Sequence, residues 1–237
     1  MNLEGNGMVA SDKAVMLLGF GGPSSFKEVR TFIYDVTHGR NVPQDRIETV
    51  VEQYKAIGGK SPFKELTKRQ ALALQVALAE QGLDIPVVPG FLYCSPYINE
   101  TIKELVSNKV SYIVAIVMAP HRTEASFDRY VKAVEQACNV GIYESVEVIP
   151  YNVKVSESIG MTLGNASKIN KHAIQIEFVP AWHTHPMFIE ALLDRIQAKL
   201  SLILQGELKY TQIIFTAHSV PIYMSEKSLH CMPAQLL

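Results

Sequence analysis

Short, continuous apolar runs alternate with stretches of helical periodicity along most of this chain, and no other feature restricts its fold as strongly. The apolar runs cover residues 14–20, 85–88, 112–118 and 174–179. Helical spacing of apolar residues occupies residues 26–34, 43–57, 67–82, 98–106, 127–134 and 186–203. Runs this short fit buried strands, and strands that alternate with helices pair in parallel through right-handed crossovers. The sequence therefore predicts an α/β fold: a doubly wound parallel sheet with helices on both faces.

Three of the predicted helices depend on particular residues. Pro43 suits the first turn of a helix whose apolar stripe runs from Ile47 to Ile57, before Gly58-Gly59 ends it. Thr67-Lys68-Arg69-Gln70 has the form of a capping box and predicts a helix that starts at Thr67. The last helix is expected to bury its apolar side, which consists of Phe188, Ile189, Leu192, Leu193, Ile196 and Leu200.

Two segments lack a clear pattern. Residues 1–12 are small and polar, which predicts a flexible tail. Residues 139–171 have weak periodicity and are interrupted by Gly, Asn and Ser, although 146–149 fits a strand. We interpret this second segment as a loop-rich insertion.

A further apolar run, Gln212–Phe215, leads to His218 and stops at Pro221. It predicts a buried parallel strand that carries an imidazole at its carboxyl end, where open α/β sheets bind ligands. His121 follows the run 112–118 in the same way. Neutral imidazole binds Fe²⁺ and Zn²⁺ and accepts protons near pH 7. The alternative is a strand-end histidine whose ring is satisfied by a backbone carbonyl.

Other motifs give weaker signals. Gly19-Phe20-Gly21 looks like the start of a dinucleotide-binding loop, but Ser24 stands where the third glycine is needed. Trp182-His183-Thr184-His185-Pro186 spaces two imidazoles as a metallohydrolase could use them, yet the proline before the helix favours a capping loop. The cysteines, at positions 94, 138 and 231, are odd in number and widely spaced, so we expect no disulfide framework.

Charge and hydropathy exclude several classes of partner. The net charge of −1 provides no basic field for nucleic acid. No apolar run approaches the roughly 18 residues of a transmembrane helix. The N-terminus has no charged region followed by an apolar region, so it does not fit a secretory signal. We therefore expect a cytoplasmic protein without a nucleic-acid partner.

Short stretches in order across nearly the whole chain resemble the ferrochelatase family. They are Leu18–Pro23, Val36–Pro43, Tyr54–Pro62, Ser95–Ile98, Trp182–Pro186 and Phe215–Pro221. Enzymes of this family, which are lyases, insert Fe²⁺ into a porphyrin in haem biosynthesis. The patterns at Phe20 and Val36–Pro43 are most similar to the branch that acts on coproporphyrin III, with protoporphyrin IX as the other substrate of the family.

The resemblance implies two similar α/β lobes with the porphyrin in the cleft between them. It implies that His218 is the catalytic residue, which binds the incoming metal or takes pyrrole protons. The substrate-binding residues that it implies are Phe20, Gly21, Arg40, Tyr54, Ser61 and Tyr130, with Arg40 as the partner of a propionate. It implies no resident cofactor, because Fe²⁺ is a substrate. For Phe20, Tyr54 and Tyr130, plain core packing is the alternative.

The resemblance is incomplete toward the C-terminus. We interpret residues 1–208 as the first lobe and 209–237 as a stub of the second, since the family's partner glutamate would lie beyond residue 237. His38 also stands where an arginine is common in the family. The alternative function is therefore a non-catalytic fragment that binds porphyrin or metal. In such a fragment the run at 212–215 would expose Ile213, Ile214 and Phe215.

Overall fold

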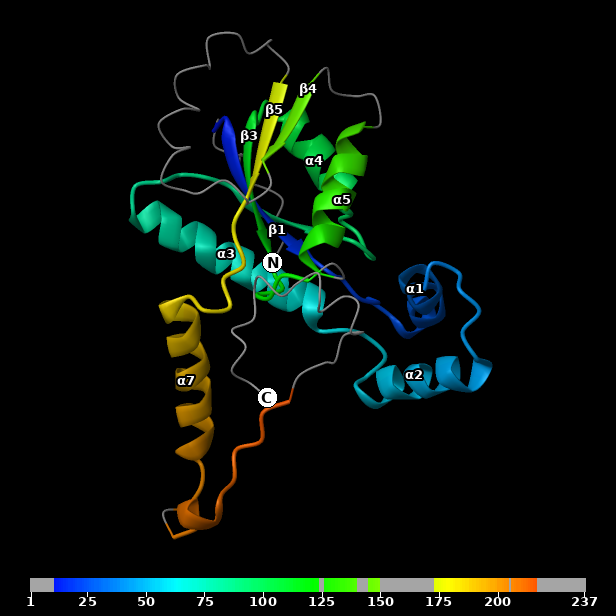
Figure 1. Ribbon diagram of the computed structural model, residues 1–237, viewed down its shortest axis with the longest axis vertical. Helices are drawn as coiled ribbons and strands as arrows, with labels where there is room; N and C mark the ends of the chain where they lie inside the picture. Colours follow the sequence, from blue (N-terminus) through cyan, green and yellow to red (C-terminus); the bar gives the residue numbers. More distant parts are fainter. Residues whose placement is uncertain (1–10, 124–125, 140–144, 150–172, 205, 217–237) are drawn as a thin grey trace. The chain divides into compact units, whose positions relative to one another are not determined.

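The sheet expected from the alternating pattern is present in the computed structural model (Figure 1), which describes residues 11–123, 126–139, 145–149, 173–204 and 206–216. Its strands are β1 Lys13–Gly19, β2 Val87–Phe91, β3 Tyr112–Val117, β4 Ser145–Ile149 and β5 Ala173–Phe178. They lie in the order β2-β1-β3-β5-β4, and every neighbouring pair is parallel. The prediction of a parallel α/β sheet is confirmed, and the strand suggested at 146–149 is β4.

Helices connect the strands, as predicted. They are α1 Val29–Val36, α2 Gln44–Ala56, α3 Phe63–Glu80, α4 Ile98–Ser107, α5 Phe127–Asn139 and α7 Pro186–Leu200. Two short 3₁₀ turns, η1 Phe26–Glu28 and η3 Leu208–Tyr210, complete the described elements. None of these described helices has the length and hydropathy that a membrane span requires.

The interior strand β1 is buried on both faces. Val15 and Leu17 pack against Ala71 and its neighbours on α3. Met16 points to the opposite face because side chains alternate along a strand. On that face a Cβ built at Gly90 would lie 3.3 Å from Met16 Sδ and 3.4 Å from the Cα of Ile98, the first residue of α4. Helices α3 and α4 therefore cover opposite faces (Figure 1), which confirms the doubly wound arrangement in this part of the chain.

The second strand lies later in the chain than predicted, at Val87–Phe91 instead of 85–88. Pro89 looks like a strand end in the sequence because proline has no N–H to donate. β2 is an edge strand of the sheet, however, and an edge tolerates a missing donor. The strand therefore continues through Gly90 to Phe91.

Two helix predictions also need correction. α3 starts at Phe63, not at Thr67, because the Thr67 hydroxyl does not cap a helix start but donates to the carbonyl of Phe63 at 2.9 Å. The apolar stripe of α2 is less buried than expected. Val51 is buried, whereas Ile57, just beyond the helix, is 59% exposed.

The chain divides into two compact units, which we describe separately. Unit 1 consists of Met1–Met118 and Tyr130–Val179 and contains the sheet. Unit 2 consists of Ala119–Arg129 and Pro180–Leu237 and contains α7. The lobe boundary after residue 208 stays a prediction. Most of the predicted tail and insertion lies outside the described residues, but Asp12 is anchored, since its carbonyl accepts from the N–H of Ser111 at 2.8 Å.

The C-terminal part of unit 2 differs most from expectation. Helix α7 contains no buried residue, and Ile189, Leu192 and Leu193 of its apolar side are 43%, 45% and 49% exposed. Residues 211–216 are not a strand, and Ile214 and Phe215 are 80% and 81% exposed. The prediction of a buried helix side and a buried strand is wrong here, because periodicity leads to burial only where another element packs against it. The exposure expected for an unpaired run at 213–215 is confirmed.

A hydrogen-bonded pair, Tyr112 on β3 and Glu177 on β5, makes the stability of unit 1 vary with pH in the alkaline range. The Tyr112 hydroxyl donates to a carboxylate oxygen of Glu177, and burial of the phenol together with this bond raises the pKa of Tyr112 to about 12. The folded state thus favours the neutral phenol, and its contribution is full below the unfolded pKa of about 10. We expect the free energy of unfolding to fall as pH rises from about 10 to about 12.

The Tyr112→Phe variant cannot ionise at this position, so its unfolding free energy should fall less steeply across that range. Guanidinium unfolding followed by circular dichroism at a series of pH values measures both slopes. Equal slopes in the two proteins would contradict the assignment.

Candidate functional site

An aromatic cluster lies in unit 1 where β1 and β2 end, formed by Phe20, Phe32, Tyr54 and Tyr93. The ring of Phe20 lies 4.8 Å from that of Tyr93 and 6.2 Å from that of Phe32, between ring centroids. The rings of Tyr54, on α2, and Phe32 lie edge to face, with 6.1 Å between their centroids. All four rings are half-buried, and burial raises the pKa of the Tyr54 phenol. The cluster therefore offers partly accessible ring surface beside the carboxyl end of a central strand, where α/β sheets bind ligands.

Backbone hydrogen bonds fix Phe20 in the cluster. The N–H of Tyr93 donates to the carbonyl of Phe20 at 3.1 Å, and the N–H of Leu92 donates to that of Gly19 at 3.1 Å. The loop after β2 therefore follows the loop after β1 for two residues beyond the sheet. Sequence reasoning named Phe20 and Tyr54 but missed Phe32 and Tyr93. Tyr93 comes two residues after the end of β2, whereas the strand predicted at 85–88 ends five residues before it, so no signal for this ring was available in the sequence.

Gly21 and Ser61 hold loops close together beside this cluster. Gly21 has φ +88°, and a Cβ there would lie 2.8 Å from Sγ of the buried Cys94. A Cβ at Gly22 would lie 2.5 Å from that of Ser61. The N–H of Ser61 donates to the carbonyl of Pro23 at 2.9 Å, and its hydroxyl oxygen accepts from the N–H of Phe63 at 3.2 Å. Both predicted residues thus lie in the walls of one junction, where their described contacts are structural.

The remaining predicted site residues are spread more widely. Arg40 is exposed and follows two residues with positive φ, His38 at +54° and Gly39 at +65°. The ring of His38 lies 6.3 Å from that of Tyr93, which places this loop beside the aromatic cluster. Tyr130 on α5 is only 4% exposed. His218 lies outside the described residues.

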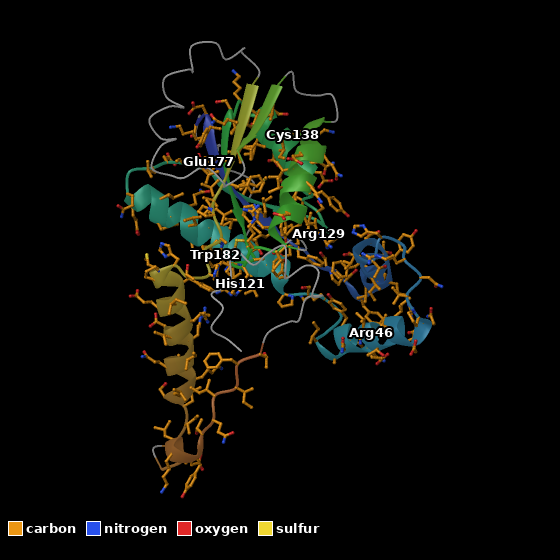
Figure 2. All side chains as sticks on the ribbon, in the orientation of Figure 1. Arg46, His121, Arg129, Cys138, Glu177 and Trp182 are labelled. Atoms are coloured by element: carbon orange, nitrogen blue, oxygen red, sulfur yellow. The ribbon has the colours of Figure 1, made fainter. Side chains whose placement is uncertain are left out.

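A second group of side chains gathers in unit 2, where His121 and His183 lie ring against ring. Their centroids are 4.8 Å apart and their planes are inclined by 31°. The N–H of Trp182 donates to the carbonyl of Pro120 at 3.2 Å, which joins the two segments next to the imidazoles. Figure 2 labels His121 and Trp182 on these two segments. Burial, with a smaller effect of His183, lowers the pKa of His121.

This arrangement replaces the pairing of His183 with His185 that the sequence suggested. Nδ1 of His185 accepts from the N–H of Met187 at 3.3 Å, so this imidazole caps the start of α7. The capping-loop interpretation is confirmed, and the metallohydrolase pair is not formed. His121 and His183 follow β3 and β5, which are neighbours in the sheet, and this strand order could not be read from the sequence.

Charged groups near the histidine pair are already engaged. Arg122 lies 3.2 Å from Asp128 in an ion pair, and its guanidinium lies 4.9 Å from the centroid of the Phe127 ring. The Ser126 hydroxyl donates to the carbonyl of His121 at 2.9 Å. Across the described ranges no cluster of three or more His, Cys, Asp or Glu residues could hold a metal ion.

Comparison with known proteins points to one family. The family model described as ferrochelatase matches residues 12–236. A ferrochelatase of Deinococcus radiodurans is 26% identical over 88% of this chain and 57% of its own length. A coproporphyrin III ferrochelatase of Nocardia farcinica is 27% identical over 89% of this chain and 52% of its own length. A ferrochelatase of Rhodopirellula baltica is 28% identical over 89% of this chain and 52% of its own. The chain thus spans about half the length of the curated relatives that it matches.

Proposed function

The chain belongs to the ferrochelatase family, and from this premise we propose that it inserts Fe²⁺ into a porphyrin in haem biosynthesis, a lyase reaction. The porphyrin is coproporphyrin III or protoporphyrin IX, and ferrous iron is the second substrate, with no resident cofactor. Several of the similar proteins are coproporphyrin III ferrochelatases, which favours the first of these substrates. We further propose that the reaction takes place in the cytoplasm.

The observation that carries this proposal is the aromatic cluster at the carboxyl ends of β1 and β2. A porphyrin is a flat, largely apolar ring system, and half-buried aromatic side chains bind such surfaces through offset and edge contacts. Phe20 and Tyr93 are the central pair of this surface, at 4.8 Å between centroids. Gly21 permits the close approach of the neighbouring loops that keeps Phe20 beside Tyr93.

Arg40 supplies the polar part of the proposed site. Its side chain is exposed on the loop that also carries His38, whose ring contacts Tyr93 of the cluster. Porphyrin propionates are carboxylates at the edge of the ring, and guanidinium binds carboxylates with two parallel hydrogen bonds. A macrocycle on the aromatic cluster would therefore direct a propionate toward this loop.

His218 performs the chemical step in the proposal. Metallation requires removal of two pyrrole protons and replacement of the water around Fe²⁺. A neutral imidazole accepts protons near pH 7 and also binds ferrous iron, so either role suits His218. Distortion of the ring by the cleft would expose the nitrogen lone pairs to the metal.

The second candidate function is porphyrin binding without turnover. It is favoured by one observation, namely that the aromatic cluster, which is all that binding requires, lies within the described residues. The two candidates differ in a single measurement. Both predict porphyrin binding, and only the first predicts a change in the Soret band when Fe²⁺ is added without oxygen.

Binding is tested by fluorescence titration of coproporphyrin III and protoporphyrin IX with the wild-type chain and with Phe20→Leu. We expect Phe20→Leu to bind about fivefold more weakly, because loss of ring contacts costs about 1 kcal/mol. Phe26→Leu is the matched control, since Phe26 is 49% exposed on η1. Unchanged affinity of Phe20→Leu would reject the cluster as the porphyrin surface, and binding without metal insertion would favour the second candidate.

A further inference from the structure

Two imidazoles in unit 2 lie together without a role in the proposed reaction. The rings of His121 and His183 have a centroid separation of 4.8 Å and an angle of 31° between planes. Nδ1 of His183 is buried and has no hydrogen-bond partner among the described residues. We propose that His121 and His183 together bind one divalent transition-metal ion of the class that includes Zn²⁺ and Co²⁺.

The backbone holds the two rings in place before any metal arrives. The hydrogen bond from the Trp182 N–H to the Pro120 carbonyl, at 3.2 Å, lies one residue before each histidine. The loop that carries His121 is closed by the Ser126 hydroxyl, which donates to the His121 carbonyl at 2.9 Å. The Arg122–Asp128 ion pair, at 3.2 Å, spans the same loop. The main chain therefore loses little further conformational freedom when a metal binds.

The distance between the rings suits a shared metal. Zinc–nitrogen bonds are about 2.0–2.1 Å, so two imidazoles on one tetrahedral ion have centroids roughly 5 Å apart. The observed 4.8 Å is close to this value.

The chemistry of the pair selects the class of ion. Neutral imidazole is a ligand for Zn²⁺, Co²⁺, Ni²⁺ and Cu²⁺, whereas Mg²⁺ and Ca²⁺ prefer oxygen. A metal would also use the buried lone pair of His183 Nδ1, which no described group satisfies.

The site is an open one. The Asp128 carboxylate is held by Arg122, and no third His, Cys, Asp or Glu joins the pair in the described part of the chain. Water would fill the remaining positions, as it does at open zinc sites. We therefore expect weaker binding than at a closed four-ligand site.

The test uses Zn²⁺ alone and Co²⁺ alone as probes on the full chain that carries His218→Ala. This background removes the metal ligand assigned under the proposed function, so that failure of one proposal is separate from failure of the other. Isothermal titration with Zn²⁺ should give one site per chain, unaffected by excess Mg²⁺. Adding His121→Ala or His183→Ala should weaken this binding at least about tenfold, since each removes one of two ligands.

His185→Ala is the matched control, because it removes an imidazole that lies two residues from His183 in the sequence and caps the start of α7. It should leave Zn²⁺ affinity unchanged. Equal weakening by His185→Ala, or unchanged affinity in both pair variants, would overturn the proposal.

A second measurement uses the His218→Ala chain with His121 and His183 intact. Its result does not depend on whether the variants of the pair fold. X-ray absorption at the zinc edge and the visible spectrum of bound Co²⁺ report the number of imidazole ligands. Two imidazole nitrogens are expected, together with oxygen ligands. One imidazole or none would overturn the site even if Zn²⁺ binds elsewhere on the chain.

Discussion

The Gly21→Ala variant is expected to lose about 2–5 kcal/mol of unfolding free energy, which would unfold much of a marginally stable protein. Gly21 has φ +88°, a conformation that costs a residue with a Cβ about 1–2 kcal/mol. The added methyl group would also lie 2.8 Å from Cys94 Sγ and 3.2 Å from Cys94 N. Cys94 is buried, so neither atom can move away freely, and overpacking adds about 1–3 kcal/mol.

Gly58→Ala separates the two contributions. Gly58 has nearly the same backbone angle, φ +87°, but a Cβ there would meet nothing within 4 Å. Gly58→Ala should therefore lower the free energy of unfolding by about 1–2 kcal/mol, from the backbone conformation alone. Guanidinium unfolding of both variants gives the difference, and equal losses would contradict a close contact at Gly21.

The Cys94→Ala change provides a rescue. It removes the sulfur atom nearest to the new methyl group, so Gly21→Ala should cost less in that background than in the wild-type chain. A double-mutant cycle measures the coupling between the two positions. The same cycle with porphyrin affinity as the readout tests whether the junction of these loops keeps Phe20 in place for binding.

The sheet was predictable because its interior strand β1 is buried on both faces and β3 and β5 are short apolar-rich runs. A parallel strand such as β1 must be apolar at every position, and the run 14–20 stands out in the sequence for that reason. The bounds of β2 were not predictable from local pattern. The effect of Pro89 depends on whether a strand lies at an edge, and that position is a property of the whole sheet.

Burial of the helices was harder to predict than their existence. Periodicity identifies an apolar side, but only a neighbouring element buries it. The stripe of α4 meets the sheet and contains the fully buried Ile102, whereas the equally regular stripe of α7 leaves Leu193 at 49% exposure. The start of α3 was also mispredicted from a local pattern. The Thr67 hydroxyl donates to the carbonyl of Phe63 inside the helix and does not cap its first turn.

The candidate site residues divide along similar lines. Phe20 and Gly21 follow a strand directly, and topology alone places such residues at a sheet edge. Tyr93 also follows a strand, but the loop conformation that turns its ring toward Phe20 depends on hydrogen bonds between two loops far apart in the sequence. The pairing of His121 with His183 required the strand order, which puts β5 beside β3.

Under the proposed function, the His218→Ala variant is expected to insert Fe²⁺ at least about 100-fold more slowly than the wild-type chain. A general base accelerates proton removal about 10²–10⁴-fold, and removal of a metal ligand would slow insertion further. Alanine can neither accept a pyrrole proton nor displace water from Fe²⁺. The rate is measured anaerobically from the Soret band with coproporphyrin III as the substrate.

Porphyrin affinity should respond differently, because binding is assigned to the aromatic cluster and not to the imidazole. We expect the dissociation constant for porphyrin to stay within about twofold in His218→Ala, so that the rate of insertion falls while binding persists. His185→Ala is the control, since its imidazole caps α7, and it should insert iron at the wild-type rate. If His218→Ala inserted iron as fast as that control, another group would have to remove the protons.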